Sequence, residues 1–528
     1  MKLQKLFEND TLLITASGLL FSIGWPTYGF SFFLFFAFVP LLLLEESYIN
    51  NSKKKYFFIK IYLAFFIWNL FKTWWILNST LVGGVFAIIV NSFLMTFVFW
   101  LFHFVRKRLP QSMALAFFIA VWISFEKFHL NWDFSWPWLN LGNGFSDYTK
   151  WIQWYEYTGV FGGTSWILLV NVLIYSSLTN YLKTKNLQYR QLARIFLWLL
   201  VPMIFSFYLY KNYKEKGNTA KVLILQPNLD PWNDKFNYSN AELAENLLQI
   251  SNPDADLILA PETAISQYTE IDRFEHSKAY RILKKYVDEN PKVSIVTGVD
   301  FIHWYQKDDS IPDTANKTKN GHWYDMYNSA VLIDEEPKFK VYHKSKLVVG
   351  AEFTPYAKFL KPLIGDFMIN LGTSMGSNVT QKERGVFKPE NSQIKLAPII
   401  CYESIYGEFV TGYIKKGANL LGVITNDGWW KNTEGHRQHF SMARLRAIEN
   451  RRDLVQSANT GISGLINQKG DVIQSLGYDK RGAILIKVHL NETRTFYSKY
   501  GDIIARIAQF MAVLLFLYTF SRKKVRLF

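Results

Sequence analysis

The stretch Leu396-Ala-Pro-Ile-Ile-Cys-Tyr-Glu403 places Cys401, the one cysteine among 528 residues, at the end of an apolar run. A short aliphatic run of this kind predicts a buried strand, and its last side chain is presented at the strand end. A chain with one thiol cannot form an internal disulfide, so Cys401 is either a small core residue or a nucleophile. The core role is the commoner one for an isolated cysteine, and the surrounding motifs have to decide between the two.

Similar apolar runs occur on both sides of this strand, from about residue 213 to residue 499, and amphipathic stretches separate several of them. We expect strands at 221–226, 257–260, 293–297, 329–333, 394–401, 420–425 and 454–457, and helices at 241–250, 278–288 and 436–452. Alternation of strands with helices is typical of an α/β layered domain. The loops at strand ends carry the chemistry in such domains, so the residues there are the candidates for a site.

Three strand ends in this region carry reactive side chains. Glu262 follows the run 257–261, Lys344 ends the run 338–344, and Cys401 ends the third. Alone, a loop glutamate or a lysine is usually a solvated surface residue. Together they supply what attack by a thiol on a carbonyl requires, namely a carboxylate base, a nucleophile and an ammonium that stabilises the oxyanion. This combination favours the nucleophile role for Cys401.

Histidine and metal chemistry are less well supported by the sequence. His343 precedes Lys344 and points to the opposite face of a strand, while His436 and His439 lie on an expected helix. None of them is placed to pair with the thiol as in a papain-like site. The sequence also lacks the close ligand spacing of a zinc site. We therefore expect no metal and no cofactor.

The first two hundred residues and the last thirty have the pattern of a membrane protein. No charged residue occurs from Thr11 to Leu44, a stretch that holds two short helices broken around 25–29. Further apolar runs lie at about 56–75, 81–105, 113–125, 159–182, 195–210 and 503–520. We expect a membrane domain of seven helices over 1–212, a catalytic domain over 213–499, and an eighth helix with a basic tail over 500–528. The tryptophan-rich loop 127–158 is either an interfacial belt or a re-entrant segment.

Basic residues in the short loops set the expected orientation, because such residues stay on the cytoplasmic side. They cluster at residues 2–5, 53–55, 106–108 and 183–194, in alternate loops, and again at 522–526. We expect both termini in the cytoplasm, the polar domain outside, and an N-terminal apolar run retained as an anchor. These clusters account for much of the net charge of +16, so we expect no nucleic-acid partner.

Three motifs resemble the nitrilase superfamily, whose members place a Glu-Lys-Cys triad on an αββα sandwich. They are Ala260-Pro-Glu262-Thr, Lys344-x-x-Leu-Val-x-x-x-Glu352 and Ile400-Cys401-Tyr402-Glu403. Two further segments, Asn426-Asp427-Gly-Trp429 and Gln438-His-Phe-x-Met-Ala-Arg444-x-Arg446-Ala-Ile-Glu449, are similar to the membrane-embedded branch of that superfamily, the apolipoprotein N-acyltransferase family. With the membrane spans, the resemblance covers nearly the whole chain. It implies a nitrilase-like αββα sandwich for residues 213–499.

The resemblance also implies a role for individual residues. Glu262 would be the general base, Cys401 the nucleophile and Lys344 the oxyanion stabiliser. The supporting or substrate-binding residues would be Glu352, Tyr402, Glu403, Asn426, Trp429 and Trp232, the last on a mobile loop over the site. The chain departs from the family pattern at Ala260, where Trp is common, and at Val349-Gly350-Ala351, where Pro-Phe-Gly is common. We expect these changes to alter the pocket wall and the loop rather than the chemistry.

The reaction that the resemblance implies is acyl transfer in two steps at the outer face of a bacterial inner membrane. Cys401 would take an acyl chain from a phospholipid as a thioester, and the α-amino group of a lipoprotein's N-terminal diacylglyceryl cysteine would then receive it. The expected partners are therefore a phospholipid, a lipoprotein and the bilayer, and we expect a monomer.

Two alternatives remain for the activity. A membrane-anchored amidase of the same superfamily would share the triad and use water as its second nucleophile. A transporter with an outer binding domain would carry ionisable residues at mid-membrane. Lys60, Lys72 and Glu126 lie towards span ends, where we expect them to reach the membrane surface, which disfavours transport.

Overall fold

The computed structural model describes residues 9–51, 54–232, 235–312, 315–356, 359 and 376–521. The basic residues Lys2, Lys5 and Lys53 and the tail from Arg522 onward lie outside the described residues. The chain divides into two compact units. The first comprises Met1–Trp74, Gly84–Asn212 and Tyr500–Phe528, and the second comprises Trp75–Gly83 and Tyr213–Lys499. Nothing in the sequence indicated that Trp75–Gly83, which links two apolar helices, belongs to the polar unit.

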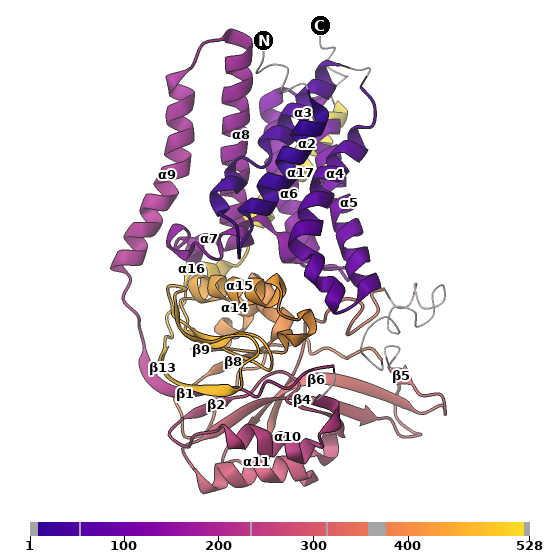
Figure 1. Ribbon diagram of the computed structural model, residues 1–528, viewed down its shortest axis with the longest axis vertical. Helices are drawn as coiled ribbons and strands as arrows, with labels where there is room; N and C mark the ends of the chain where they lie inside the picture. Colours follow the sequence, from indigo (N-terminus) through magenta and orange to yellow (C-terminus); the bar gives the residue numbers. More distant parts are fainter. Residues whose placement is uncertain are drawn as a thin grey trace. The chain divides into compact units, whose positions relative to one another are not determined.

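The first unit is a bundle of apolar helices that lie side by side (Figure 1). Its helices are α2 (Asp10–Gly24), α3 (Val39–Asn50), α4 (Phe57–Thr73), α5 (Leu81–Arg106), α6 (Gln111–His129), α7 (Tyr155–Thr158), α8 (Val160–Thr184), α9 (Tyr189–Asn212) and α17 (Ile503–Ser521). Among the described residues, seven helical segments are long and apolar enough to cross a bilayer. The chain is therefore a multi-pass membrane protein. Helix α2, the first expected span, has 15 residues and is shorter than the roughly 20 that a span needs.

Glu126 does not reach the membrane surface, so the expectation for this residue was wrong. Its side chain is buried in the bundle and accepts hydrogen bonds from Trp122 Nε1 (3.1 Å), Leu141 N (2.8 Å) and Thr164 Oγ1 (2.7 Å). A buried carboxylate is tolerated when its lone pairs are filled in this way. Lys72 is also buried, whereas Lys60 is half-buried and pairs with Asp10 at 2.5 Å.

The tryptophan-rich loop is a folded part of the first unit. It contains three short 3₁₀ helices, η3 (Pro137–Leu139), η4 (Leu141–Phe145) and η5 (Thr149–Trp151). Trp138 and Phe145 have no exposed surface, and the Tyr155 hydroxyl donates to the carbonyl of Gly142 at 2.8 Å. Its buried aromatic side chains therefore pack within the bundle.

The second unit contains an 8-stranded sheet with the order β13-β1-β2-β4-β6-β5, in which β3 also pairs with β4 and β7 with β6. Its strands are β1 (Asn218–Gln226), β2 (Leu257–Leu259), β3 (Ile265–Glu270), β4 (Ser294–Trp304), β5 (Asn316–Lys317), β6 (Trp323–Ile333), β7 (Lys340–His343) and β13 (Gly482–Leu490). Strand β2 lies parallel to β1 and β4, and β4 pairs antiparallel with β6 from Ile295↔Ile333 to Trp304↔Tyr324. Strands β4 and β6 extend beyond the expected segments, and β13 was not predicted.

A second sheet of five strands has the order β12-β11-β10-β9-β8. Its strands are β8 (Leu396–Ile400), β9 (Leu420–Thr425), β10 (Leu454–Ala458), β11 (Ser463–Ile466) and β12 (Val472–Leu476). Strands β8, β9 and β10 are parallel. Pro398 lies inside β8, and it is tolerated there because β8 is the edge strand, where a missing N–H breaks no ladder bond. The strand that ends at Cys401 is thus a buried edge strand.

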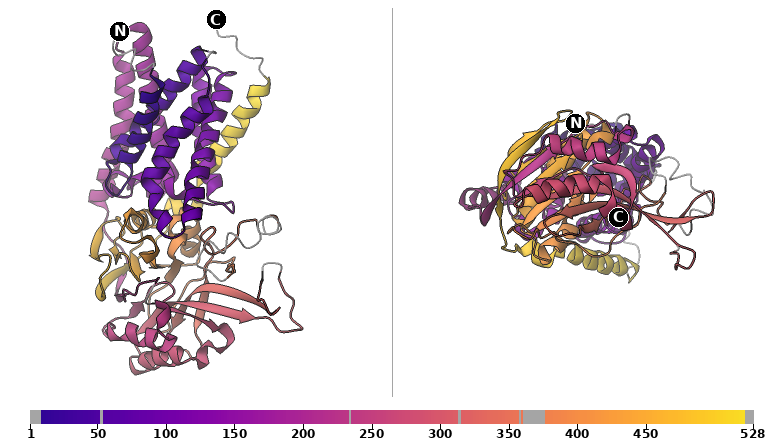
Figure 2. Two further views of the ribbon diagram at one scale, coloured as in Figure 1. Left: turned by 45° about the vertical axis from the view of Figure 1, so that its right-hand side comes forward. Right: turned by 90° about the horizontal axis from the view of Figure 1, so that it is seen from below.

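Helices cover the outer face of each sheet. Helices α10 (Asn240–Gln249) and α11 (Lys278–Glu289) lie along the first sheet (Figure 2), and α14 (Gly407–Lys415) and α15 (Glu434–Asn450) pack on the second. A short helix α16 (Phe496–Tyr500) follows β13. Side chains spaced along one face of α10 and α11, such as Leu243, Leu283 and Val287, pack into a core with Leu223 and Ile295 of the sheet. Strands β1 and β10 bring the two sheets face to face. The predicted αββα sandwich is confirmed.

Candidate functional site

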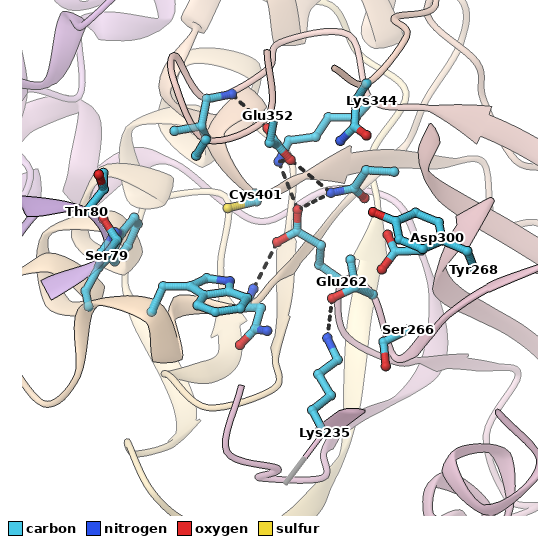
Figure 3. Close-up of a pocket in the computed structure, with 18 of the residues that line it drawn as sticks. Ser79, Thr80, Lys235, Glu262, Ser266, Tyr268, Asp300, Lys344, Glu352 and Cys401 are labelled. Atoms are coloured by element: carbon cyan, nitrogen blue, oxygen red, sulfur yellow. Dashed lines mark hydrogen bonds and ion pairs between the residues drawn. The ribbon is translucent and has the colours of Figure 1, made fainter. Parts of the chain in front are cut away.

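Loops at the ends of β2, β7 and β8 meet in one cavity of about 360 Å³ in the second unit (Figure 3). Glu262, Lys344 and Cys401 all line it, so the fold brings together the three reactive residues that the sequence places far apart. The rest of the wall consists of Ser79, Thr80, Lys235, Thr263, Ser266, Gln267, Tyr268, Asp300, Asn328, Val348, Ala351, Glu352, Asn378, Asn426, Trp429 and Trp430.

The turn that carries Glu262 is held against strand β4. Ala260 N donates to Val296 O at 2.8 Å, and Gly298 N donates to Pro261 O at 3.0 Å. A Cβ on Gly298 would lie 2.3 Å from the amide nitrogen of Thr263, so only glycine permits this approach. Thr263 itself has φ +48°, a left-handed conformation that costs a non-glycine residue roughly 1–2 kcal/mol. The turn is thus fixed by contacts to β4, and these contacts direct Glu262 into the cavity.

Lys344 forms a buried ion-pair network with two carboxylates. Its Nζ donates to Glu262 Oε1 at 2.9 Å and to Glu352 Oε1 at 2.8 Å. Asn328 Nδ2 donates to the same two oxygens at 2.8 and 3.2 Å. Burial opposes the charge on Lys344, but the two carboxylates outweigh it and hold its pKa well above the ordinary value. Burial likewise opposes ionisation of Glu262, yet Lys344 lowers the pKa of that carboxyl. Lys344 and Glu262 are therefore both charged near neutral pH.

The backbone fixes where Lys344 and Glu352 stand. Lys344 follows β7, and its amide donates to Asn328 O at 2.8 Å, which ties it to strand β6. Glu352 accepts a bond from Val348 N at 2.7 Å on the oxygen that Lys344 does not use. The turn 348–352 therefore folds back on its own glutamate. The eight-residue spacing between lysine and glutamate suits this turn despite the altered Val349-Gly350-Ala351 segment.

Cys401 follows strand β8 at the start of the 3₁₀ helix η8 (Cys401–Ile405). Its φ of +47° lies in the left-handed region, and strain of about 1–3 kcal/mol at such a position is typical of functional sites. Burial and the nearby Glu262 carboxylate raise the pKa of the Cys401 thiol, while Lys344 opposes the shift. The resting thiol is therefore protonated, and an ionised carboxylate lines the same cavity.

A buried histidine supports the backbone of the cysteine, and sequence reasoning missed it. His439 Nδ1 lies 3.0 Å from Asp427 Oδ1, and its Nε2 lies 2.8 Å from Ser404 Oγ and 3.2 Å from the carbonyl oxygen of Cys401. Burial opposes the charge on His439, but Asp427 raises its pKa. The histidine thus contacts the main chain at Cys401 rather than its sulfur. Both residues fall in the segments that resemble the family, but no local pattern pairs a loop aspartate with a helical histidine.

Glu403 anchors the turn that follows the cysteine. It is fully buried and accepts hydrogen bonds from Ile400 N (2.9 Å), Ser345 N (2.6 Å), Tyr342 Oη (2.7 Å) and Tyr413 Oη (3.2 Å). These bonds join the cysteine turn to the residue after Lys344. Tyr402 is also buried and packs edge-to-face against Tyr406, with 5.3 Å between ring centres.

We expect Glu403→Gln to lower the free energy of unfolding by roughly 1–3 kcal/mol, because the amide group cannot accept from four donors and leaves some of them buried and unpaired. The rate of Cys401 acylation should fall with it, since the cysteine turn and the lysine loop lose their common anchor. Thermal unfolding and acylation rate would both be measured. Glu245→Gln on the exposed face of α10 is the matched control. A Glu403→Gln protein as stable and as active as the parent would refute the anchoring role.

Asn426 and Trp429 lie at the cavity wall, and Trp232 lies beyond it. Asn426 N donates to Glu262 Oε2 at 3.1 Å. Asn426 Oδ1 accepts from Asn459 Nδ2 at 3.2 Å, which leaves the buried Asn426 Nδ2 without a hydrogen-bond partner among the described residues. Trp232 is 42% exposed and meets Trp429 edge-to-face at 4.9 Å between ring centres.

The segment Trp75–Gly83 supplies part of the same wall, which sequence reasoning did not predict. Ser79 and Thr80 line the cavity. Trp75 packs edge-to-face on Trp430 with 4.8 Å between ring centres, and Asn78 Nδ2 lies 3.5 Å from the Trp430 carbonyl oxygen. Within the part of the chain that the structure describes, no group of three or more His, Cys, Asp or Glu side chains could hold a metal ion.

Comparison with known proteins gives matches along almost the whole chain. The family model for the apolipoprotein N-acyltransferase N-terminal domain matches residues 17–173, and that for carbon-nitrogen hydrolase matches residues 222–497, more than half of the chain. An apolipoprotein N-acyltransferase of Chlorobaculum tepidum is 26% identical over 542 residues, which cover 99% of this chain and 98% of the relative. Another, of Geobacter metallireducens, is 26% identical and covers 98% and 96%.

Among solved structures, a carbon-nitrogen hydrolase from Helicobacter pylori G27 is 15% identical, with a TM-score of 0.35 and coverage of 57% of this chain and 94% of the other.

Proposed function

The chain belongs to the carbon-nitrogen hydrolase family, in its membrane-embedded apolipoprotein N-acyltransferase branch, and from this membership we propose that it transfers an acyl group through a thioester on Cys401. The donor is a phospholipid, and the acceptor is the α-amino group of a lipoprotein's N-terminal diacylglyceryl cysteine. The observation that carries the mechanism is that Cys401 and the ionised Glu262–Lys344 pair line one cavity.

In the first half-reaction, Glu262 accepts the proton of the Cys401 thiol, and the thiolate attacks the ester carbonyl of the phospholipid. Two donors that line the cavity, the third N–H of Lys344 and the side-chain nitrogen Nδ2 of Asn426, are available to stabilise the oxyanion. Collapse of the tetrahedral intermediate breaks the ester bond. The lysophospholipid alkoxide takes the proton from Glu262, and an acyl-Cys401 thioester remains.

In the second half-reaction, the acceptor amine attacks the thioester carbonyl. The C–N bond forms, the C–S bond breaks, and the amine proton passes through Glu262 to the Cys401 sulfur. A protonated lysine beside both carboxylates keeps Glu262 ionised between the steps. The products are a triacylated lipoprotein and the free enzyme.

The apolar helices favour transfer over the amidase alternative. Extracting an acyl chain into water costs about 0.8 kcal/mol per CH₂, and both substrates carry such chains. A multi-pass membrane protein lets both substrates keep their tails in lipid. We propose the bacterial inner membrane as its location, with the second unit on the periplasmic side, both termini in the cytoplasm and a monomeric protein. The alternating basic loops at 106–108 and 183–194 support this orientation.

The direct test is intact-mass spectrometry of the purified protein after exposure to phospholipid, followed by addition of a synthetic diacylated lipopeptide. We expect an acyl adduct on Cys401 that disappears as the peptide gains the acyl chain. An adduct lost only to water would identify a membrane-anchored amidase. No adduct at all would return Cys401 to a role in the core.

Trp232 is proposed as part of a lid over the cavity, because its exposed ring packs on the cavity-lining Trp429. An edge-to-face aromatic pair contributes about 0.5–1.5 kcal/mol to the stability of a contact. Loss of this pair should therefore favour the open position of the lid, in which water reaches the cavity. We therefore expect the acyl-enzyme of Trp232→Ala to hydrolyse up to about tenfold faster. The lifetime is measured by mass spectrometry without acceptor. Trp323→Ala on β6 is the control, and an unchanged lifetime in Trp232→Ala would dismiss the lid.

A further inference from the structure

The cavity contains a second charged group that the thioester mechanism does not use. Asp300 on β4, Lys235, and Ser266 and Tyr268 of the β3 region line the cavity beyond Glu262 (Figure 3). Lys235 is buried and donates to the hydroxyl of Thr263, the residue after the proposed base. The part of the cavity that Lys235 and Asp300 line is therefore joined to the catalytic residues by the turn that carries Glu262.

The Asp300 carboxylate is available to a ligand. Among the residues that the structure describes, none forms a hydrogen bond or an ion pair with its side chain, although Lys235 lies close enough to influence its charge. By contrast, Glu262 accepts bonds from Lys344, Asn328 and Asn426. The Ser266 hydroxyl, on a side chain only 2% exposed, is also without a hydrogen-bond partner among those residues. Buried polar groups are nearly always paired, so the Ser266 hydroxyl, beside a cavity-lining Asp300 carboxylate, points to a polar ligand group.

The pKa values of the groups around Asp300 suit the binding of an amine. Burial, together with the neighbouring Glu262 and Glu352, raises the pKa of Asp300 to about 7 against the opposing effect of Lys235 and Lys344. Burial also lowers the pKa of Lys235 to about 8. Tyr268 faces the same carboxylate from β3 and remains protonated, because burial and Asp300 raise its pKa. A carboxylate that titrates near neutrality can both bind an ammonium and take its proton.

The second half-reaction needs such a group. An α-amino group has an ordinary pKa of about 7.7–8.0, so the acceptor arrives mainly as an ammonium ion that cannot attack a carbonyl. Glu262 is held by Lys344 and must still manage the proton of the Cys401 sulfur. Glu262 already carries the second amine proton to the sulfur, so the first ammonium proton needs another acceptor.

We propose that Asp300 receives the acceptor's α-ammonium group in the cavity and removes its first proton, with Ser266 as an additional polar contact. This inference rests on the proposed function. One N–H⁺ proton passes to the Asp300 carboxylate, which becomes a carboxylic acid, and the neutral amine attacks the acyl-Cys401 carbonyl. The second amine proton passes through Glu262 to the sulfur as the C–S bond breaks. Asp300 then releases its proton to solvent.

The test separates the two half-reactions in the full-length protein and in Asp300→Asn. The variant keeps the size of the side chain but can neither attract the ammonium nor accept its proton. We expect acylation of Cys401 by phospholipid at the parental rate, and transfer to a diacylated lipopeptide slowed about 100-fold in kcat/KM. Deacylation by hydroxylamine should be unchanged, because this nucleophile is uncharged at neutral pH and arrives without the ammonium proton that Asp300 removes; the one N–H proton that it loses still passes through Glu262 to the sulfur.

Asp308→Asn on an exposed loop is the matched control, and Asp300→Glu should recover part of the transfer rate. Equal transfer rates in parent and Asp300→Asn would overturn the inference and leave the acyltransferase intact. Slower acylation of Cys401 in Asp300→Asn, or slower release by hydroxylamine, would also overturn it, because Asp300 would then serve donor binding or the fold. Failure of the parent protein to form an acyl-enzyme would overturn the proposed function and the inference together.

Discussion

Replacing Cys401 with alanine is expected to abolish acyl-enzyme formation and to reduce lipoprotein acylation by at least about 10³-fold, the scale of losing a catalytic nucleophile. The physical reason is that no other thiol exists in the chain, and the Glu262 carboxylate then has no nucleophile to activate. Alanine keeps the Cβ and the buried volume changes little, so the melting temperature should stay within a few degrees of the parent's. Mass spectrometry and lipopeptide acylation measure the two effects.

Cys401→Ser gives a sharper version of the same experiment. A hydroxyl in this buried position is a far weaker acid than a thiol, so a carboxylate with a lowered pKa cannot activate it. We expect this variant to be as inactive as Cys401→Ala while it still binds phospholipid. Substantial transfer by either variant would mean that acylation proceeds without a covalent intermediate on this residue.

The second large effect is expected from Lys344→Met. This change removes the cation between the buried Glu262 and the half-buried Glu352 and leaves both carboxylates without their ion-pair partner. Breaking a buried ion pair from one side costs roughly 3–5 kcal/mol, so the variant should unfold at a markedly lower denaturant concentration. Acyl-enzyme formation should also be lost, because the oxyanion stabiliser is gone and Glu262 no longer stays ionised. Lys338→Met at an exposed position is the matched control.

The loss of stability in Lys344→Met should depend on pH in a defined direction. In the parent, Lys344 holds the pKa of Glu262 below 4.5, so this carboxylate contributes stability above that value and the contribution is lost as the pH falls. In the variant, only Asn328 and Lys235 still oppose the effect of burial on Glu262, so its pKa rises, and protonation in acid relieves the cost of the buried charge. We expect the stability difference to be largest near pH 7 and to shrink below about pH 5. A difference independent of pH would show that lost packing, not charge, causes it.

Local patterns in the sequence were sufficient for the architecture. The strand β9 was predicted at its observed bounds, Leu420–Thr425, and the helices α10 and α11 within one residue at each end. Apolar periodicity has a range of a few residues, so it can be read without the fold. The antiparallel strands β11 to β13 were missed. Strand β12 is exposed except at Leu476, and burial along β13 alternates from one residue to the next.

The reactive residues were also readable, because each stands directly after a strand. Glu262, Lys344 and Cys401 were named from strand ends and from the motifs around them, and the structure brings all three into one cavity. The prediction for Glu126 was wrong because a position along a helix does not show which other elements surround the side chain. Its place near the end of α6 indicated a route to the membrane surface, but three donors from α6, η4 and α8 enclose it.

The sequence by itself determined the membrane helices, the α/β alternation and the three strand-end residues, because these depend on hydrophobic period and on neighbours along the chain. Only the tertiary structure decided that Asn328 joins two carboxylates, that His439 and Asp427 hold the cysteine turn, and that Asp300 lines the same cavity. Those contacts join residues on different elements, and their distances are set by how the two sheets and their helices pack. No local pattern of residues encodes a distance of that kind.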